Sequence, residues 1–214
     1  MVLPAIALRG TTILPGMIVH FDVSRERSVK AIEAAMLHDQ KIFLVTQIDP
    51  EVESPDLAGV YHVGTIAYIK QVVKLPQNLL RVLVEGTGRA TLVKFEQEFP
   101  FIRSEITPVD EEEMQMPEPV MEAMDRSLKE LFHRYCMENG KVSKELVAQI
   151  LNIDNVEELV EQIAVNIPLS YQNKQKILEA LTLEERYEVL GAILGNEIEI
   201  MQIGRDLQKK VKAR

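Results

Sequence analysis

The chain has 214 residues, 46% of them hydrophobic, and its 33 acidic and 24 basic residues give it a net charge of −9. This acidic balance argues against a general nucleic-acid or membrane-surface binder. The single cysteine excludes an internal disulfide framework, and no apolar run approaches the roughly 18 residues of a membrane-spanning helix, so we expect a cytoplasmic protein without membrane partners.

The first part of the chain is predicted to be mostly β. An apolar segment over residues 3–8 and alternating apolar residues over 17–23 indicate two strands. Ser24 is a favourable N-cap for the helix expected next, in which apolar residues recur at helical spacing. A further strand is predicted over 41–48. The pattern therefore indicates strands with one helix inserted early.

Residues 63–95 predict three consecutive strands around which the remaining elements are arranged. Apolar residues alternate along 63–74, the sequence PQN at 76–78 is typical of a turn, and Gly86-Thr87-Gly88 indicates a second turn. Both faces of these strands carry apolar residues, so the sheet must be covered on both sides or closed on itself. Another strand is predicted over 99–110.

The second half of the chain is predicted to be helical. The acidic, proline-containing stretch 113–119 is the expected linker between a β-rich domain over 1–112 and a helical domain over 120–214. Helix starts are indicated by Ser143, by Asp154 with Glu157, and by Thr182 with Glu185. The last helix, over about 182–212, would be on the order of 46 Å long. Its apolar stripe is typical of a coiled-coil entry or an interdomain strut.

No catalytic, cofactor-binding or metal-ligating residue is predicted. The sequence contains no GxxxxGK[ST], HExxH, CxxC or GxSxG motif. Gly86-Thr87-Gly88 is interpreted as a turn because no helix opens after it, as a phosphate loop requires. Cys136 has no base near it in sequence, so a structural thiol is the simpler interpretation. The chain is therefore expected to bind rather than to catalyse.

Three sets of residues are candidates for contact with a partner, and each has a simpler alternative. Apolar residues at a predicted hairpin tip either face the core or form a contact site. Methionines around the linker either bind apolar segments or fill a seam between domains. Charged residues at the first helix start are otherwise ordinary surface charge. The three sets are Leu75, Leu79 and Leu80; Met114 and Met116, with Met121 and Met124; and Arg25, Glu26 and Arg27.

Several segments resemble, in order, the N-terminal region of the bacterial ATP-dependent Lon proteases (endopeptidase La). The resemblance extends over the whole chain but over only this region of the family's protein. The matching segments are LPAIALR (3–9), LPG (14–16), SVKAIEAAMLHD (28–39), KIFLVTQ (41–47), VGTIA (63–67), KLP (74–76), VLVEGTGR (82–89), EERY (184–187) and residues 197–211.

The resemblance implies an α+β fold, in which a PUA-like pseudo-barrel with one inserted helix precedes a helical bundle that ends in a long helix. It implies a substrate-recognition and assembly module, whose partners are unfolded or damaged proteins and the family's own ATPase and Ser–Lys peptidase domains. ATP and Mg²⁺ serve the full-length hexameric enzyme, whereas no cofactor is expected in this chain. We expect the fragment to be a monomer or weak dimer, and Arg25, Glu26 and Arg27 match a charged triplet of the family.

Two other kinds of function stay open at this point. A standalone PUA-like module could bind RNA or a small ligand, although the net charge of −9 weighs against RNA. An enzyme with an unrecognised site would require a closed pocket with converging polar groups and strongly shifted pKa values.

Overall fold

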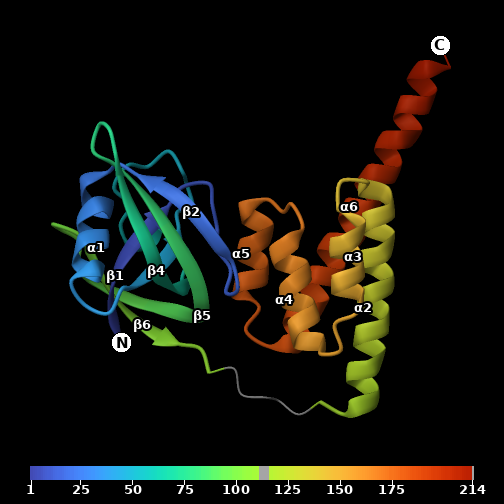
Figure 1. Cartoon of the computed structure of the whole chain (residues 1–214), viewed down its shortest axis with the longest axis horizontal. Coiled ribbons are helices and arrows are strands. Elements are labelled where there is room, and N and C mark those ends of the chain that lie inside the picture. Colours follow the sequence, from blue (N-terminus) through green and yellow to red (C-terminus); the bar gives the residue numbers. More distant parts are fainter. Residues whose placement is uncertain (111–115, 214) are drawn as a thin grey trace. The chain divides into compact units, whose positions relative to one another are not determined.

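The computed structural model describes residues 1–110 and 116–213, which form two compact units (Figure 1). The mixed α+β class is as predicted. The boundary expected at 113–119 stays a prediction, because part of that stretch lies outside the described residues. The first unit holds Met1–Asp110 and Ser170–Glu179, and the second holds the described residues of Glu111–Leu169 and Ala180–Arg214.

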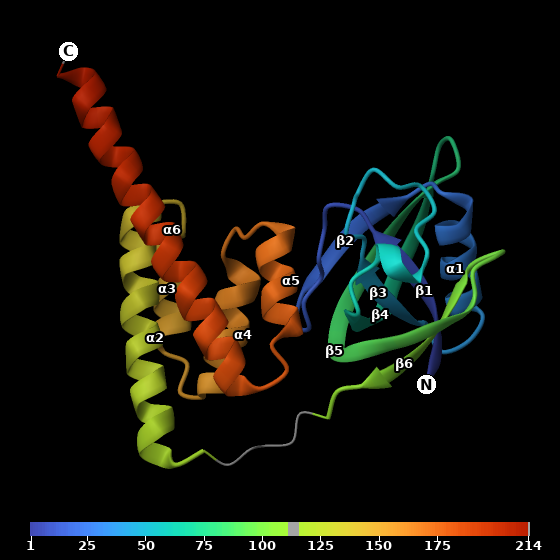
Figure 2. The ribbon, with the colours of Figure 1, turned by 180° about the vertical axis from the view of Figure 1, so that it is seen from behind.

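The strands of the first unit form one sheet that closes on itself, as Figures 1 and 2 show from opposite sides. The strand order is β2-β5-β4-β3-β1-β6, and an additional pairing of β5 with β6 closes the barrel. Among the strands of the described residues, β1 and β3 pair in parallel and all other pairs are antiparallel. The predicted pseudo-barrel is therefore confirmed. Its strands are β1 (Val2–Leu8), β2 (Ile18–Val23), β3 (Lys41–Thr46), β4 (Val63–Leu75), β5 (Leu79–Gln97) and β6 (Ile102–Pro108).

Closure of the sheet forms the hydrophobic core of the first unit, and the inserted helix packs against the sheet. Phe43, Leu92, Ile102 and Ile106 are buried together among apolar residues of five strands. Helix α1 (Glu26–Met36) contacts β1 and β3 and buries the face that carries Ile32. A short 3₁₀ helix, η1 (Leu57–Gly59), lies on the connection from β3 to β4. Most apolar residues of the strands are thus buried, whereas Ile18, Val73 and Val93 remain exposed.

The predicted turn at Gly86-Thr87-Gly88 is wrong, because β5 continues through it as one strand. Ala67 of β4 pairs with Gly86, whereas the preceding Ile66 pairs with Gly88, so Thr87 is the extra residue of a β-bulge. The Gly86 N–H donates to Met17 O, and Gly86 O accepts from the Gly16 N–H, both at 2.9 Å. A Cβ on Gly86 would lie 2.5 Å from Leu14 O. Glycine permits this close backbone approach rather than a turn.

Helix starts agree with the sequence patterns at two places and differ by one residue at two others. Ser143 and Thr182 cap α3 and α6 as predicted. Ser24 is not the cap of α1, since Arg25 takes that position without a side-chain cap bond. The capping oxygen of α4 belongs to Asn155 rather than Asp154, because the helix begins one residue later than expected. Asp154 and Asn155 have similar capping chemistry, so the sequence left the start of α4 undetermined by one residue.

The second unit is built from helices. Helices α2 and α6 pack along each other and bury Leu128, Phe132, Leu190 and Leu194. The C-terminal part of α6 leaves a stripe of apolar residues more than half exposed, namely Ile200, Ile203, Leu207 and Val211. The long final helix is therefore confirmed. The bounds of the helices are α2 (Glu118–Asn139), α3 (Lys144–Leu151), α4 (Val156–Asn166) and α6 (Leu183–Lys212).

Helix α5 (Tyr171–Glu179) belongs to the barrel unit, although helices precede and follow it in sequence. The buried Arg89 of β5 donates from Nε to Leu178 O at 3.1 Å and from Nη2 to Ile177 O at 3.4 Å. The buried Gln175 donates from Nε2 to Val63 O at 3.0 Å. A guanidinium at the final carbonyl groups of a helix is favoured by the helix dipole. Arg89 therefore anchors the C-terminal end of α5.

We predict that Gly86→Ala destabilises the fold by about 1–3 kcal/mol, because the new methyl group overlaps the Leu14 carbonyl. Gly88→Ala is the matched control, since nothing lies within 4 Å of a Cβ at that position of the same bulge. Urea unfolding of both variants measures the difference. Equal midpoints would contradict the close-approach explanation for Gly86.

Replacement of the α5 anchor, Arg89→Met, is expected to cost about 1.5–3 kcal/mol of stability, because buried helix carbonyls lose a charged donor. Hydrogen exchange of residues 171–179 should accelerate. Arg126→Met is the control, because Arg126 makes an exposed i,i+4 ion pair with Glu122. Unchanged exchange in α5 would show that Arg89 does not hold it.

Candidate functional site

The residue that begins α1 is fixed to the barrel by its guanidinium. Arg25 Nη1 donates to Gln47 Oε1 at 2.9 Å and to Glu53 O at 2.7 Å, and Nη2 donates to Ala7 O. It therefore joins β1, the residue that follows β3 and the acidic loop before η1. Burial lowers the pKa of Arg25, and the nearby positive charges of Arg9 and Arg27 lower it further.

The next basic residue is held in a similar way. Arg27 Nη2 donates to Pro55 O at 3.1 Å, and its guanidinium lies 5.5 Å from the centroid of the Phe99 ring. The simpler interpretation of the charged triplet as ordinary surface charge is thus wrong for Arg25 and Arg27, which are half-buried. It holds for Glu26, whose exposed carboxylate pairs with Lys30 at 3.0 Å.

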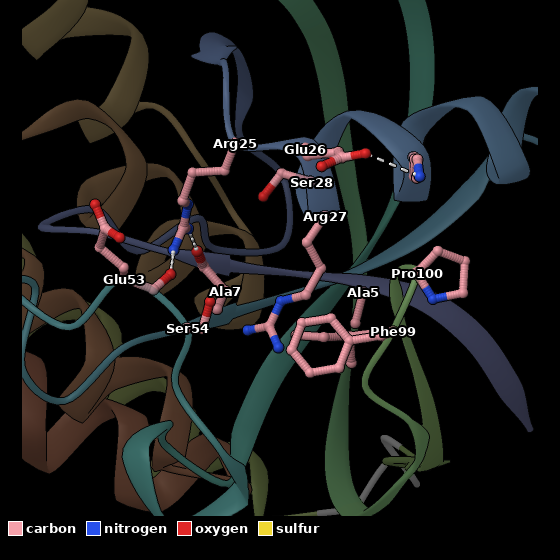
Figure 3. Close-up of a pocket in the computed structure, with 12 residues that line it drawn as sticks. Ala5, Ala7, Arg25, Glu26, Arg27, Ser28, Glu53, Ser54, Phe99 and Pro100 are labelled. Carbon is pink, nitrogen blue, oxygen red and sulfur yellow. Dashed lines mark hydrogen bonds and ion pairs between the residues drawn. The ribbon is translucent and has the colours of Figure 1, made fainter.

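The two arginines flank a pocket of about 470 Å³ at the N-terminal end of α1 (Figure 3). Its walls combine charged side chains of the helix with small and apolar residues of β1, β6 and the loop between β5 and β6. Phe99 stands at this loop with two-thirds of its surface exposed. The lining residues are Ala5, Ala7, Arg25, Glu26, Arg27, Ser28, Lys30, Glu53, Ser54, Phe99, Pro100 and Ile102.

A second pocket of about 520 Å³ lies on the other side of the same helix start. It is formed by α1 and the β4–β5 hairpin, so Leu75 and Leu79, both half-buried, contribute apolar surface, while Leu80 is mostly buried. The hairpin turns through two residues with left-handed backbone, Gln77 at φ 67° and Asn78 at φ 59°. Its lining residues are Ser24, Glu26, Val29, Lys30, Glu33, Lys74, Leu75, Asn78, Leu79 and Leu80.

Two of the three predicted sets are thereby brought together. The pocket of the arginines and the pocket of the leucines share Glu26 and Lys30 of α1. We call the surface lined by these two pockets the α1 surface. It places apolar side chains, fixed positive charge and exposed carboxylates within one part of the barrel unit, which suits binding of a partner better than chemistry.

The third set lies elsewhere. Met116 and Met121 line a groove of about 700 Å³ in the helical unit, together with carboxylates of α2 and α4 such as Glu122 and Glu157. Met124 is buried in the core of that unit. Met114 lies outside the described residues. The predicted methionine contact site therefore stays a prediction.

Two lining residues were not singled out in the sequence. Phe99 follows the end of β5 and looks in sequence like the start of the next strand, yet it lies in the connecting loop. Ser28 occupies a polar position in the first turn of α1 but is only 6% exposed. A bulky aromatic residue beside Pro100, between two strands, was the one available signal for Phe99.

The described residues offer no centre for catalysis that we can identify. Among them, no group of three or more His, Cys, Asp and Glu side chains could hold a metal ion. None of the described helices combines the length and apolar character needed to cross a membrane. Cys136 is buried in the helical unit, and burial raises the pKa of its thiol from 9.0 to about 11. The thiol is therefore a poor nucleophile near neutral pH.

Comparisons with known proteins agree on one family. The family model described as the ATP-dependent protease La (LON) substrate-binding domain matches residues 2–196. The chain is 47% identical to the Lon protease of Lachnoclostridium phytofermentans and 40% identical to that of Brevibacillus choshinensis, each over 98% of this chain. It covers 26% and 27% of those relatives, so the chain spans about a quarter of their length.

A solved structure gives the same result for the fold. The N-terminal domain of a Mycobacterium avium complex Lon protease superimposes with a TM-score of 0.70 at 20% sequence identity. The match covers 93% of this chain and 98% of the other. At this identity the likeness concerns the arrangement of strands and helices rather than any shared activity.

The buried thiol gives a pH prediction. At pH 8 the thiol of the folded chain should react with iodoacetamide about 100-fold more slowly than the thiol of the chain in urea. The reason is that raising the thiol pKa from 9.0 to about 11 lowers the fraction of reactive thiolate about 100-fold. Because folding raises this pKa, the thiol favours the folded state below pH 9.0, and this contribution is lost as the pH rises to about 11. Equal alkylation rates in both states would contradict the burial of Cys136.

Proposed function

Because the chain belongs to the family of Lon substrate-binding domains, we propose that it recognises unfolded or damaged proteins for an ATP-dependent Lon protease. In this proposal the chain captures a client and delivers it for ATP-driven unfolding and degradation in the cytoplasm. The ATPase, which uses ATP and Mg²⁺, and the Ser–Lys peptidase belong to other parts of the longer protein. Neither motif occurs in the 214 residues, so the chain by itself is expected to hydrolyse neither ATP nor peptide bonds.

The α1 surface is the observation that carries the proposal. It exposes Phe99 and parts of Leu75 and Leu79 beside fixed charges, whereas exposed apolar side chains elsewhere in the unit, such as Ile18, Leu37 and Val93, line neither pocket. Unfolded proteins differ from folded ones chiefly in the apolar segments that they expose. A surface that combines small apolar pockets with charge can therefore distinguish the two without reading a particular sequence.

Such pockets support weak binding, which fits a protein that must release what it captures. Each holds a few apolar contacts, and the exposed area of a partly buried leucine is worth about 1 kcal/mol. Several copies held in one ring would act together on a long client and raise the overall affinity. We propose that the exposed stripe on α6, from Ile200 to Val211, serves this assembly by continuing toward the ATPase module or toward neighbouring copies.

We predict that an unfolded, reduced casein-like protein binds the chain at least tenfold more tightly than a folded protein of similar size and charge. The double variant Leu75→Ser/Leu79→Ser should weaken binding of the unfolded protein about tenfold, because two partly exposed leucines leave the α1 surface. Fluorescence anisotropy titrations measure both effects.

Val93→Ser is the matched control, since Val93 is an exposed apolar residue of β5 that lines neither pocket. Its affinity for the unfolded protein should equal that of the unaltered chain. Equal or undetectable binding of the unfolded and folded proteins would overturn the proposed function. Loss of binding in the Val93 variant, with no loss in the double leucine variant, would show that the binding site lies outside the α1 surface.

A further inference from the structure

The N-terminal end of α1 is a positively polarised position without a side-chain cap. In an α-helix the first backbone N–H groups lack intrahelical acceptors, and the dipole places partial positive charge there. Arg25 occupies the N-cap of α1, and its side chain makes no cap bond, since it points into the barrel. The first turn of this 11-residue helix lines the pocket of Figure 3.

A buried hydroxyl at the same place has no partner in the described part of the chain. Ser28 is 6% exposed and lines the pocket, and no hydrogen bond of its side chain is found among the described residues. Figure 3 shows this hydroxyl between the side chains of Arg25 and Arg27, directed into the pocket. Ser28 Oγ is not one of the fully buried polar atoms that lack a partner, so the little exposure of this residue includes its oxygen, which can donate to an acceptor bound in the pocket.

Two guanidinium groups supply charge that no carboxylate in this pocket neutralises by a hydrogen bond. The acceptors of Arg25 are two backbone carbonyls and the Gln47 amide, and the acceptor of Arg27 is the Pro55 carbonyl. The nearest carboxylate on α1, Glu26, is paired with Lys30. Both arginines are thus fixed in place; the charges of Glu53 and Glu98 act on Arg25 and Arg27 without a hydrogen bond to either guanidinium.

The remaining lining is apolar on the side of β1, β6 and the loop before β6, and polar at Lys30, Glu53 and Ser54. Ala5 and Ala7 of β1 and Ile102 of β6 line the pocket beside the arginines, and the exposed Phe99 ring stands at the loop next to Arg27. A volume of about 470 Å³ accommodates a few amino-acid residues rather than a large cofactor. A positively polarised end and an apolar wall together fit a carboxylate that is attached next to an apolar side chain.

We propose that this pocket binds a carboxylate of the client polypeptide, with the Ser28 hydroxyl and the first-turn N–H groups of α1 as donors and Phe99 as the apolar contact. The carboxylate comes from the free C-terminus of a chain that ends in an apolar residue, or from an Asp or Glu side chain beside one. This inference rests on the proposed function, and it adds a chemical preference to it.

Two pairs of fluorescent peptides, titrated with the unaltered 214-residue chain, test the inference. The first pair is a peptide ending in Leu-Leu with a free carboxylate and the same peptide as the C-terminal amide. The second pair, both amidated, carries Leu-Glu-Leu or Leu-Gln-Leu. We expect the carboxylate member of at least one pair to bind at least tenfold more tightly, and the pair that shows the difference identifies the source of the carboxylate.

Variants locate the contact. Ser28→Ala should lower the affinity for the carboxylate peptide about fivefold and leave the affinity for its neutral partner unchanged. Phe99→Ala should lower the affinity for both peptides. The matched controls, Ser127→Ala on the exposed face of α2 and Val93→Ala on β5, should change neither. Thermal unfolding verifies that each variant folds.

Equal affinity within both peptide pairs would overturn the inference, and this outcome does not depend on the folding of any variant. If an unfolded protein still binds under those conditions, the proposed function stands and only the carboxylate preference fails. If neither the peptides nor the unfolded protein bind, both fail.

Discussion

Closure of the barrel by β5 is the constraint on which the rest of the first unit depends. This strand has 19 residues and pairs along its length with β2, β4 and β6. The bulge at Thr87 lets one strand bend from one set of partners to the next, because an extra residue increases local twist and curvature. On one side of the bulge, Gly86 forms backbone hydrogen bonds with the segment 14–17. On the other side, the Arg89 side chain donates a hydrogen bond to the end of α5. A strand broken at this place would lose the barrel and both attachments.

The arginines of α1 have two physical roles that do not conflict. Their hydrogen bonds to carbonyl groups fix the acidic loop and the start of the helix to the barrel. Those hydrogen-bond acceptors are neutral, and the carboxylates that act on the guanidinium groups, Glu53 on Arg25 and Glu98 on Arg27, make no hydrogen bond to them. A surface with fixed positive charge in a chain of net charge −9 is a local exception to the overall balance. The net charge of a chain therefore bears on its solubility and non-specific binding, whereas the local charge around a pocket bears on which ligands that pocket favours.

In the proposed function, the α1 surface would let the chain bind a client without chemistry of its own. Its two pockets lie on either side of one helix start and combine apolar walls with charge. Volumes of about 470 and 520 Å³ hold only a few amino-acid residues each, so affinity would come from repeated weak contacts along a flexible chain. The left-handed turn of Gln77 and Asn78 holds the leucines of the hairpin at this surface. Weak, adaptable contacts of this kind favour release, which a processive protease requires of its receptor.

Local signals in the sequence were sufficient for most elements. Period-two alternation gave the strands of the barrel, capping residues such as Ser143 and Thr182 gave two helix starts, and the apolar residues on both strand faces required a sheet that is covered on both sides or closed on itself. These features depend on neighbouring residues and on burial, so sequence by itself determined them. Only the tertiary structure decided that Gly86 serves close approach, that α5 packs on the barrel, and that the arginines and the hairpin leucines share one surface. Each of these depends on contacts between residues far apart in the chain, for example Arg89 with Leu178, and a sequence pattern carries no record of which distant groups will meet.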